Sequence, residues 1–374
     1  MKRVRRAALF AAVICAVLVA GCGKTYMQKK RDAAADRWAT SQAEIATSLA
    51  KGCFQRGELG RARDHINEAM KTGAPYAPMY VLAARLAAEK GELDAARRYA
   101  EAARNLQPDS AEAWYVVGTI EQTLERPDLA LAAFSEAAKL APEKTAYTLA
   151  EVELLVAEKR TEEAARRLSE ALGRTPGSVE LHVSFGDLNC LMGNDAEALA
   201  SYRIAQRLAP SRQDVAERLA AALFDAGDYA EAEPLLADLA DAEPEKTPEW
   251  VLKMWGYSLL ALGRLREARP VYERILARDE ASVDERVALA KCDLLEDQPT
   301  SARHQLDEAL KQAPDHAEAN ALMGLVLIGA GRPGEAVPHL RLALAARDCG
   351  DRERVERLLA RATAKEPEQV VPEP

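Results

Sequence analysis

Apolar residues return at a fixed interval along most of the chain. An alanine recurs every 34 residues from Ala62 to Ala232 and, after an offset of two residues, resumes at Ala268. The residue four positions later is apolar each time, and residues four apart share one face of an α-helix. The alanines are Ala62, Ala96, Ala130, Ala164, Ala198, Ala232, Ala268, Ala302 and Ala336, followed by Ile66, Ala100, Phe134, Leu168, Tyr202, Leu236, Tyr272, Leu306 and Leu340. This pattern predicts nine copies of one helix.

Glycine and proline follow the same period. The glycines are Gly57, Gly91, Gly193, Gly227, Gly263 and Gly331, and the prolines are Pro108, Pro142, Pro176, Pro210, Pro244 and Pro314. A glycine permits positive φ where a helix ends, and a proline suits the start of the next helix. Each period is therefore a pair of helices joined by a turn. Glu280 and Asp348 replace two of the expected prolines.

The composition agrees with an all-helical protein. Apolar residues make up 48% of the 374 residues, yet aromatic residues only 5%. Alanine and leucine supply much of the apolar fraction, and both are strong helix formers. One helix pair cannot bury its apolar face, so the pairs have to stack into an array.

The clearest unit, residues 111–144, resembles the tetratricopeptide repeat. The matching residues are Trp114, Val117, Gly118, Ala130, Phe134, Ala137 and Pro142. The resemblance implies a right-handed α-solenoid of about nine repeats over residues 43–350, starting near 43, 77, 111, 145, 179, 213, 249, 283 and 317. Such arrays hold a peptide or helix of a partner protein in a concave groove.

The regions outside the repeats have different characters. Residues 351–365 carry Val355, Leu358, Leu359 and Ala362 on one face, which predicts a capping helix. Residues 366–374 predict a disordered tail. Residues 22–42 are expected to form a tether that extends the first helix, with Trp38 covering that helix's exposed face. The two-residue offset falls within residues 243–249, where it either shifts the superhelix or lengthens one loop.

The N-terminus predicts a signal peptide over residues 1–21. A basic start precedes an apolar segment from Ala7 to Ala20, which is shorter than the about 20 residues of a membrane-spanning helix. Gly23-Lys24-Thr25 matches the end of a phosphate-binding loop, but Leu18 stands where that motif requires a glycine.

The four residues Val19-Ala20-Gly21-Cys22 resemble the lipobox of bacterial lipoproteins. The resemblance implies cleavage before Cys22 and lipid attachment to it, which holds the protein at the periplasmic side of a membrane. Gly23, in place of an aspartate, favours the outer over the inner membrane. The basic residues Lys24, Lys29, Lys30 and Arg31 either contact lipid headgroups or form a solvated tether.

Charge and the placement of cysteines and histidines bear on which ligands this chain can bind. The formal net charge of −9 disfavours nucleic acid as a partner. The six cysteines and five histidines are dispersed, so we expect no metal and no cofactor. Cys53, Cys190, Cys292 and Cys349 are expected to be unpaired, since the array separates them.

No enzyme is expected. The motifs G-x-S-x-G and H-E-x-x-H are absent, and the repeats leave no room for a catalytic domain. Asp187 and Glu153 are candidates for neighbouring acids on the inner face, although charged residues are common on a solvated helix face. Some tetratricopeptide repeats bind chaperone tails through a carboxylate clamp of lysines and asparagines on successive first helices. The corresponding face of this chain carries Thr47, Lys51, Leu82 and Arg85. The clamp asparagines are missing, so chaperone-tail binding is not predicted.

The predicted partner-binding groove lies on the first helices of the fifth to eighth repeats. Its residues are Val183, Asp187, Cys190, Phe224, Trp250, Met254, Tyr257 and Leu294. Large apolar residues here either form a binding surface or pack against the neighbouring repeat. We expect a membrane-anchored periplasmic interaction scaffold that serves envelope assembly or export. The alternative is a structural subunit or pilotin-like factor of a pilus, secretion or polysaccharide-export machine.

Overall fold

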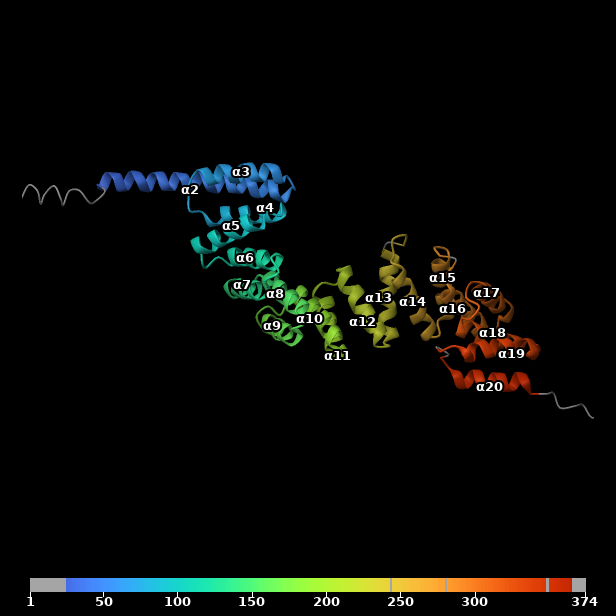
Figure 1. Cartoon of the computed structure of the whole chain (residues 1–374). Helices are drawn as coiled ribbons and strands as arrows, with labels where there is room; N and C mark the ends of the chain where they lie inside the picture. The colour runs from blue at the N-terminus through green and yellow to red at the C-terminus, as the bar shows by residue number, and fades with distance from the viewer. Residues whose placement is uncertain (1–24, 243, 280, 348–349, 365–374) are drawn as a thin grey trace, which may run out of the picture. The chain divides into compact units, whose positions relative to one another are not determined.

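The computed structural model describes residues 25–242, 244–279, 281–347 and 350–364, and every regular element in these ranges is an α-helix (Figure 1). The all-α prediction is therefore confirmed. The predicted signal peptide, Cys22 and the predicted tail at 366–374 lie outside the described residues. Among the described residues, no helix is both long enough and apolar enough to cross a membrane.

Within the described ranges, the helices form nine pairs followed by one single helix. The first helices of the pairs are α2 (Tyr26–Gln55), α4 (Ala77–Glu89), α6 (Ala111–Thr123), α8 (Thr145–Ala157), α10 (Val179–Met192), α12 (Gln213–Asp225), α14 (Glu249–Ala261), α16 (Val283–Leu295) and α18 (Ala317–Gly329). The second helices are α3 (Leu59–Lys71), α5 (Leu93–Leu106), α7 (Pro127–Leu140), α9 (Thr161–Arg174), α11 (Asp195–Leu208), α13 (Tyr229–Ala242), α15 (Leu265–Leu276), α17 (Pro299–Gln312) and α19 (Pro333–Ala345). From Ala77 onward, each first helix begins at the residue where the period places a repeat.

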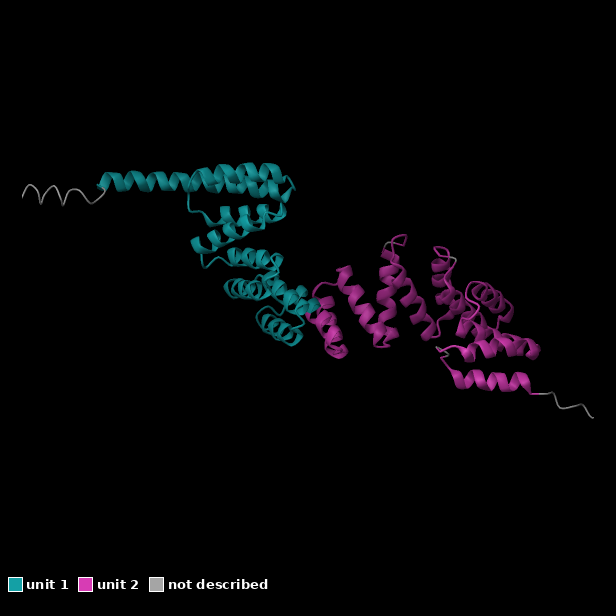
Figure 2. Cartoon of the chain, in the orientation of Figure 1, with its two compact units in different colours: residues 1–184 teal, residues 185–374 magenta. Residues whose placement is uncertain are grey.

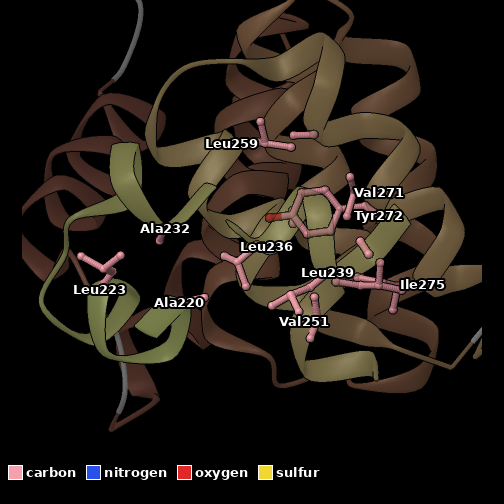
Figure 3. Close-up of a cluster of buried hydrophobic side chains, with 14 of the residues drawn as sticks. Ala220, Leu223, Ala232, Leu236, Leu239, Val251, Leu259, Val271, Tyr272 and Ile275 are labelled. Carbon is pink, nitrogen blue, oxygen red and sulfur yellow. The ribbon is translucent and has the colours of Figure 1, made fainter. Parts of the chain in front are cut away.

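Two compact units divide the chain inside α10, after Ser184 (Figure 2). Within each unit a helix packs against its neighbours along the chain, which is the arrangement of a solenoid. In the second unit, leucines and alanines from α12 to α15 surround Tyr272 in one buried cluster (Figure 3). The predicted α-solenoid is thereby confirmed, while its handedness stays a prediction.

The turns inside the pairs all contain a residue with positive φ. The six predicted glycines adopt it, with φ between 72° and 79°. Three repeats lack the glycine, and there Glu125, Lys159 and Asp297 adopt φ values of 57°, 60° and 58°. A non-glycine residue pays a steric cost in this region. The packing of the two helices therefore imposes the turn conformation even where the local sequence disfavours it.

Glycines on four first helices make room for a large side chain of the second helix. A Cβ added to Gly118 would lie 2.5 Å from the ring of Phe134. A Cβ added to Gly186 would lie 2.5 Å from the ring of Tyr202, and one added to Gly256 would lie 2.9 Å from the ring of Tyr272. Gly324 faces Leu340 in the same way. In the repeats with a phenylalanine or tyrosine at the recurring apolar position, the first helix therefore carries glycine at the crossing.

The offset of two residues lies in the loop between α13 and α14. Thr247 is buried there, and its hydroxyl donates to the Ala240 carbonyl at 2.9 Å. Arg274 on α15 donates to the Thr247 hydroxyl at 3.0 Å, and Arg278, two residues after the end of α15, donates to the Thr247 carbonyl at 2.7 Å. Together they hold the loop in place. Of the two alternatives for this offset, a lengthened loop is observed.

The two ends of the array differ. At the C-terminal end, α20 (Arg352–Thr363) packs on α19 and α18 and buries Val355 and Ala362, as expected of a capping helix. At the N-terminal end, α2 reaches back to Tyr26. The expectation that Trp38 covers the exposed face of α2 is wrong, because the Trp38 side chain is itself 66% exposed.

Candidate functional site

Two aromatic side chains on one face of α14 are exposed to solvent. Trp250 is 37% exposed and Tyr257 is 49% exposed. They are seven residues apart, so they lie on the same side of the helix. Val251, Leu252 and Leu259 on the other faces of α14 are fully buried. The core therefore does not account for the positions of the two aromatic rings.

Tyr257 belongs to a cluster of three aromatic rings. Its ring centroid lies 5.4 Å from that of Phe224 on α12 and 5.5 Å from that of Tyr229 at the start of α13. Phe224 and Tyr229 are 5.5 Å apart, and all three pairs are edge-to-face. This geometry suits aromatic quadrupoles and fixes the rings relative to one another. The cluster holds Tyr257 in place while leaving half of it accessible.

A cavity of about 240 Å³ lies beside Tyr257, and its charged lining comes from three first helices. Lys253 on α14 contacts Glu285 on α16 at 3.2 Å, and Lys291 on α16 contacts Glu318 on α18 at 2.8 Å. Asp284 accepts a hydrogen bond from Nε2 of His316 at 3.0 Å, since Nδ1 of that ring accepts one from the Ala319 amide. The hydrogen bond with Glu249 at 2.7 Å, together with the contact to Glu285, raises the pKa of Lys253 and keeps its ammonium charged.

The structure separates the predicted groove residues into three groups. Val183 is only 7% exposed, so its prediction as an accessible groove residue is wrong, and it is a packing residue of the first unit. Phe224, Met254 and Leu294 are half-buried and pack against the cores of the second unit. Asp187, Cys190, Trp250 and Tyr257 remain accessible.

Asp187 is held in a local network. Its carboxylate accepts a hydrogen bond from the Tyr202 hydroxyl at 2.7 Å and forms an ion pair with Arg218 at 3.0 Å. Burial, reinforced by the bond to Asp187, raises the pKa of Tyr202, so this hydroxyl stays protonated. Asp187 lies in the second unit and Glu153 in the first. The network gives Asp187 a structural role in joining α10 to α11 and α12.

Repeat periodicity did not point to Tyr229 or to the lysines of the cavity. Tyr229 starts a second helix, outside the first-helix positions that predict the groove. Lys253 and Lys291 follow ordinary charge patterning, and only their contacts across repeats distinguish them. The available sequence signal was the pair of aromatic residues Phe224 and Tyr229 on either side of the turn at Gly227.

In the first unit, the four residues at the register of a carboxylate clamp line one cavity of about 170 Å³. Thr47, Lys51, Leu82 and Arg85 contribute to its wall. Arg85 forms an ion pair with Glu112 at 3.0 Å. The wall of this cavity thus combines Lys51 with apolar side chains such as those of Phe54 and Val81.

Metal-binding and redox chemistry have few candidates in the described part of the chain. There, no group of three or more histidine, cysteine, aspartate or glutamate side chains is placed to hold a metal ion. Cys53, Cys190 and Cys292 are free thiols, as expected, and Cys349 lies outside the described residues. Burial raises the pKa of Cys292 to about 11, so this thiol is unreactive as a nucleophile.

Family models identify the repeats. Models described as tetratricopeptide repeat match residues 81–145, 149–213 and 259–326, more than half of the chain. The chain belongs to the tetratricopeptide repeat family. Tetratricopeptide repeat arrays present extended surfaces for binding other proteins, which makes this chain a protein-interaction scaffold in general class.

Solved tetratricopeptide repeat structures are similar in fold. YrrB, described as having an unusual peptide-binding site, is 20% identical with a TM-score of 0.42, over 52% of this chain and 97% of its own. PilW, described as a type IV pilus biogenesis factor, is 19% identical with a TM-score of 0.46, over 53% and 92%. A repeat protein from Parabacteroides merdae ATCC 43184 is 13% identical with a TM-score of 0.41, over 68% and 99%. No curated protein matches the sequence.

Proposed function

We propose that this protein is a membrane-anchored scaffold of the bacterial cell envelope, and that the first-helix face around Trp250 and Tyr257 binds a segment of a partner protein. The observation that carries the proposal is the exposure of these two rings next to a fixed aromatic cluster. Tyrosine and tryptophan bury a large area at the cost of few rotatable bonds, and they dominate the energetics of interfaces.

The charges near Tyr257 indicate the chemistry of the segment. The cavity beside the ring is lined by three carboxylates, from Asp284, Glu285 and Glu318, and by two lysine ammonium groups. The excess of negative charge favours a cationic group on the ligand. We therefore propose a segment with an apolar anchor for Trp250 and Tyr257, followed by a lysine or arginine.

Mutation of the two aromatic residues tests this proposal. The double variant Trp250→Ala/Tyr257→Ala should reduce capture of the partner from solubilised membranes by about tenfold or more, because hot-spot losses reach about 2 kcal/mol. Its melting temperature should fall only modestly, since both rings lie outside the buried core and the packing that is lost is that of Tyr257 on Phe224 and Tyr229. The partner is identified by mass spectrometry of the wild-type complex, and its recovery is compared among variants.

The matched control is Leu342→Ala, which removes an exposed apolar side chain from α19 in the same unit. Capture by this variant should equal that of the wild type. Unchanged capture by the double variant would refute the binding surface. A large fall in melting temperature would instead assign the two rings to the core.

Anchoring through Cys22 is tested separately. If Cys22 is the lipidated first residue of the mature protein, Cys22→Ser should abolish processing or release the protein from the membrane. Membrane fractionation and the mass of the N-terminal peptide report both effects. A Cys22→Ser protein that is cleaved normally and stays in the membrane fraction contradicts the anchor.

A further inference from the structure

The first repeat exposes a surface that the other repeats bury. Ile45 is 62% exposed and Leu49 is 53% exposed on α2. The residues at the position of Ile45 in the later repeats are Met79, Ala113, Tyr147, Leu181, Val215, Val251, Glu285 and Ala319, and all are buried. At the position of Leu49, Ala83, Val117, Glu151, Leu219, Leu289 and Met323 are buried, and Phe185 and Trp255 are half-buried. In those repeats the preceding helix pair supplies the cover.

The exposed surface continues along α2 as a stripe. Trp38 precedes Ile45 by seven residues and Leu49 by eleven, which places all three side chains on one face of the helix. Ala34 lies on the same face, four residues before Trp38. The first half of α2 extends beyond α3, and its residues are exposed or half-buried (Figure 1). We call Ala34, Trp38, Ile45 and Leu49 the α2 stripe.

The opposite end of the array is unsuited to cover this stripe. The outer side of α20 consists of charged, exposed residues, namely Arg352, Glu353, Arg354, Glu356, Arg357 and Arg361. A polar outer face is the usual way in which a capping element ends a repeat array. Head-to-tail stacking of two copies would place these charges against Trp38 and Ile45, which is unfavourable.

We propose that the α2 stripe pairs with the α2 stripe of a second copy of this chain in an antiparallel arrangement. With the two-fold axis between residues 41 and 42, Trp38 of each copy faces Ile45 of the other. Ala34 then faces Leu49, so that a small side chain opposes a large one. This axis lies near the middle of the 30-residue helix. The projecting half of each α2 thus covers the exposed first repeat of the other copy.

Charges beside the stripe fit the same register. Arg37 and Glu44 are seven residues apart on one flank of α2, and both are exposed. The two-fold axis brings Arg37 of one copy to within about 3 Å, along the helix axis, of Glu44 of the other, at 1.5 Å rise per residue. Neither side chain takes part in the ion pairs found among the residues that the structure describes. Two symmetric ion pairs would form in the dimer.

The mass of the full chain in solution tests the proposal, and it is independent of any partner in the groove. Density-matched sedimentation equilibrium of the full chain in mild detergent should give twice the monomer mass at micromolar concentration. Trp38→Glu/Ile45→Glu should weaken the dimer at least about tenfold without a change in circular dichroism. The matched control Ala33→Glu, on the far side of α2, should leave the dimer intact.

A charge exchange tests the register. Arg37→Glu and Glu44→Arg should each weaken the dimer about threefold to tenfold, and the combined variant should regain the wild-type affinity. A monomeric wild type overturns the proposal, as does a dimer unaffected by Trp38→Glu/Ile45→Glu. Binding of a monomer to anionic phosphatidylglycerol vesicles that Trp38→Glu abolishes would overturn it in favour of a lipid-facing stripe.

Discussion

Replacement of Arg269 by methionine is expected to lower the free energy of unfolding of the second unit by about 3–5 kcal/mol. Arg269 on α15 forms an ion pair with Asp293 on α16, and a second one with Glu296 at 3.0 Å. Asp293 is completely buried. Its second carboxylate oxygen has no hydrogen-bond partner among the described residues. Without Arg269, a buried carboxylate is left uncompensated between two repeats.

Denaturant unfolding followed by circular dichroism measures this loss, and hydrogen exchange of α15 and α16 locates it. Arg341→Met is the matched control, because Arg341 is an exposed arginine on a second helix of the same unit. Arg269→Met/Asp293→Leu should recover much of the stability, since it removes both charges. If Arg269→Met costs no more than Arg341→Met, the buried pair does not stabilise this interface.

The substitution Gly118→Ala should destabilise the first unit by about 1–3 kcal/mol, although alanine is the better helix former. The added Cβ would meet the Phe134 ring at 2.5 Å, and this ring is fully buried between α6 and α7. Either the ring or the helix crossing has to move. Thermal or denaturant unfolding of the full chain measures the cost.

A matched glycine separates the crossing from helix propensity. Gly173 lies in α9, and a Cβ there would meet nothing within 4 Å. Gly173→Ala should therefore be neutral or stabilising by up to about 1 kcal/mol. Gly118→Ala/Phe134→Ala should cost less than the sum of its two single changes, because the smaller side chain removes the clash. Additive costs would show that the crossing tolerates a Cβ.

The repeat period was sufficient to predict the helices and their crossings. A 34-residue register in alanine, glycine and proline determines which residues begin a helix and which meet at a crossing, so α4 to α19 follow from it. The burial of Val183 and the exposure of Trp38 did not follow, because a register assigns a residue to a face without stating what covers that face. The same limit applies to Arg269 and Asp293, whose pairing depends on how two adjacent repeats are rotated against each other.

The turns illustrate a second limit. Glu125 and Lys159 do not favour positive φ, and an aspartate such as Asp297 adopts it more readily but still rarely, so the residue types alone do not predict this conformation. Only their place in the period, at the position that glycine holds in the other repeats, indicates it. Tertiary packing decides the backbone at these three residues against the local preference.

The packing of each repeat against the adjacent repeats also bears on how each unit responds to force. Because the helices pack against others of the same repeat and of the adjacent repeats, the interfaces between repeats are connected in series. A pull between the two ends of a unit loads every interface with the same tension, and the small displacements at each interface add. Elastic extension of such a unit is therefore expected to be spread over all of its repeats.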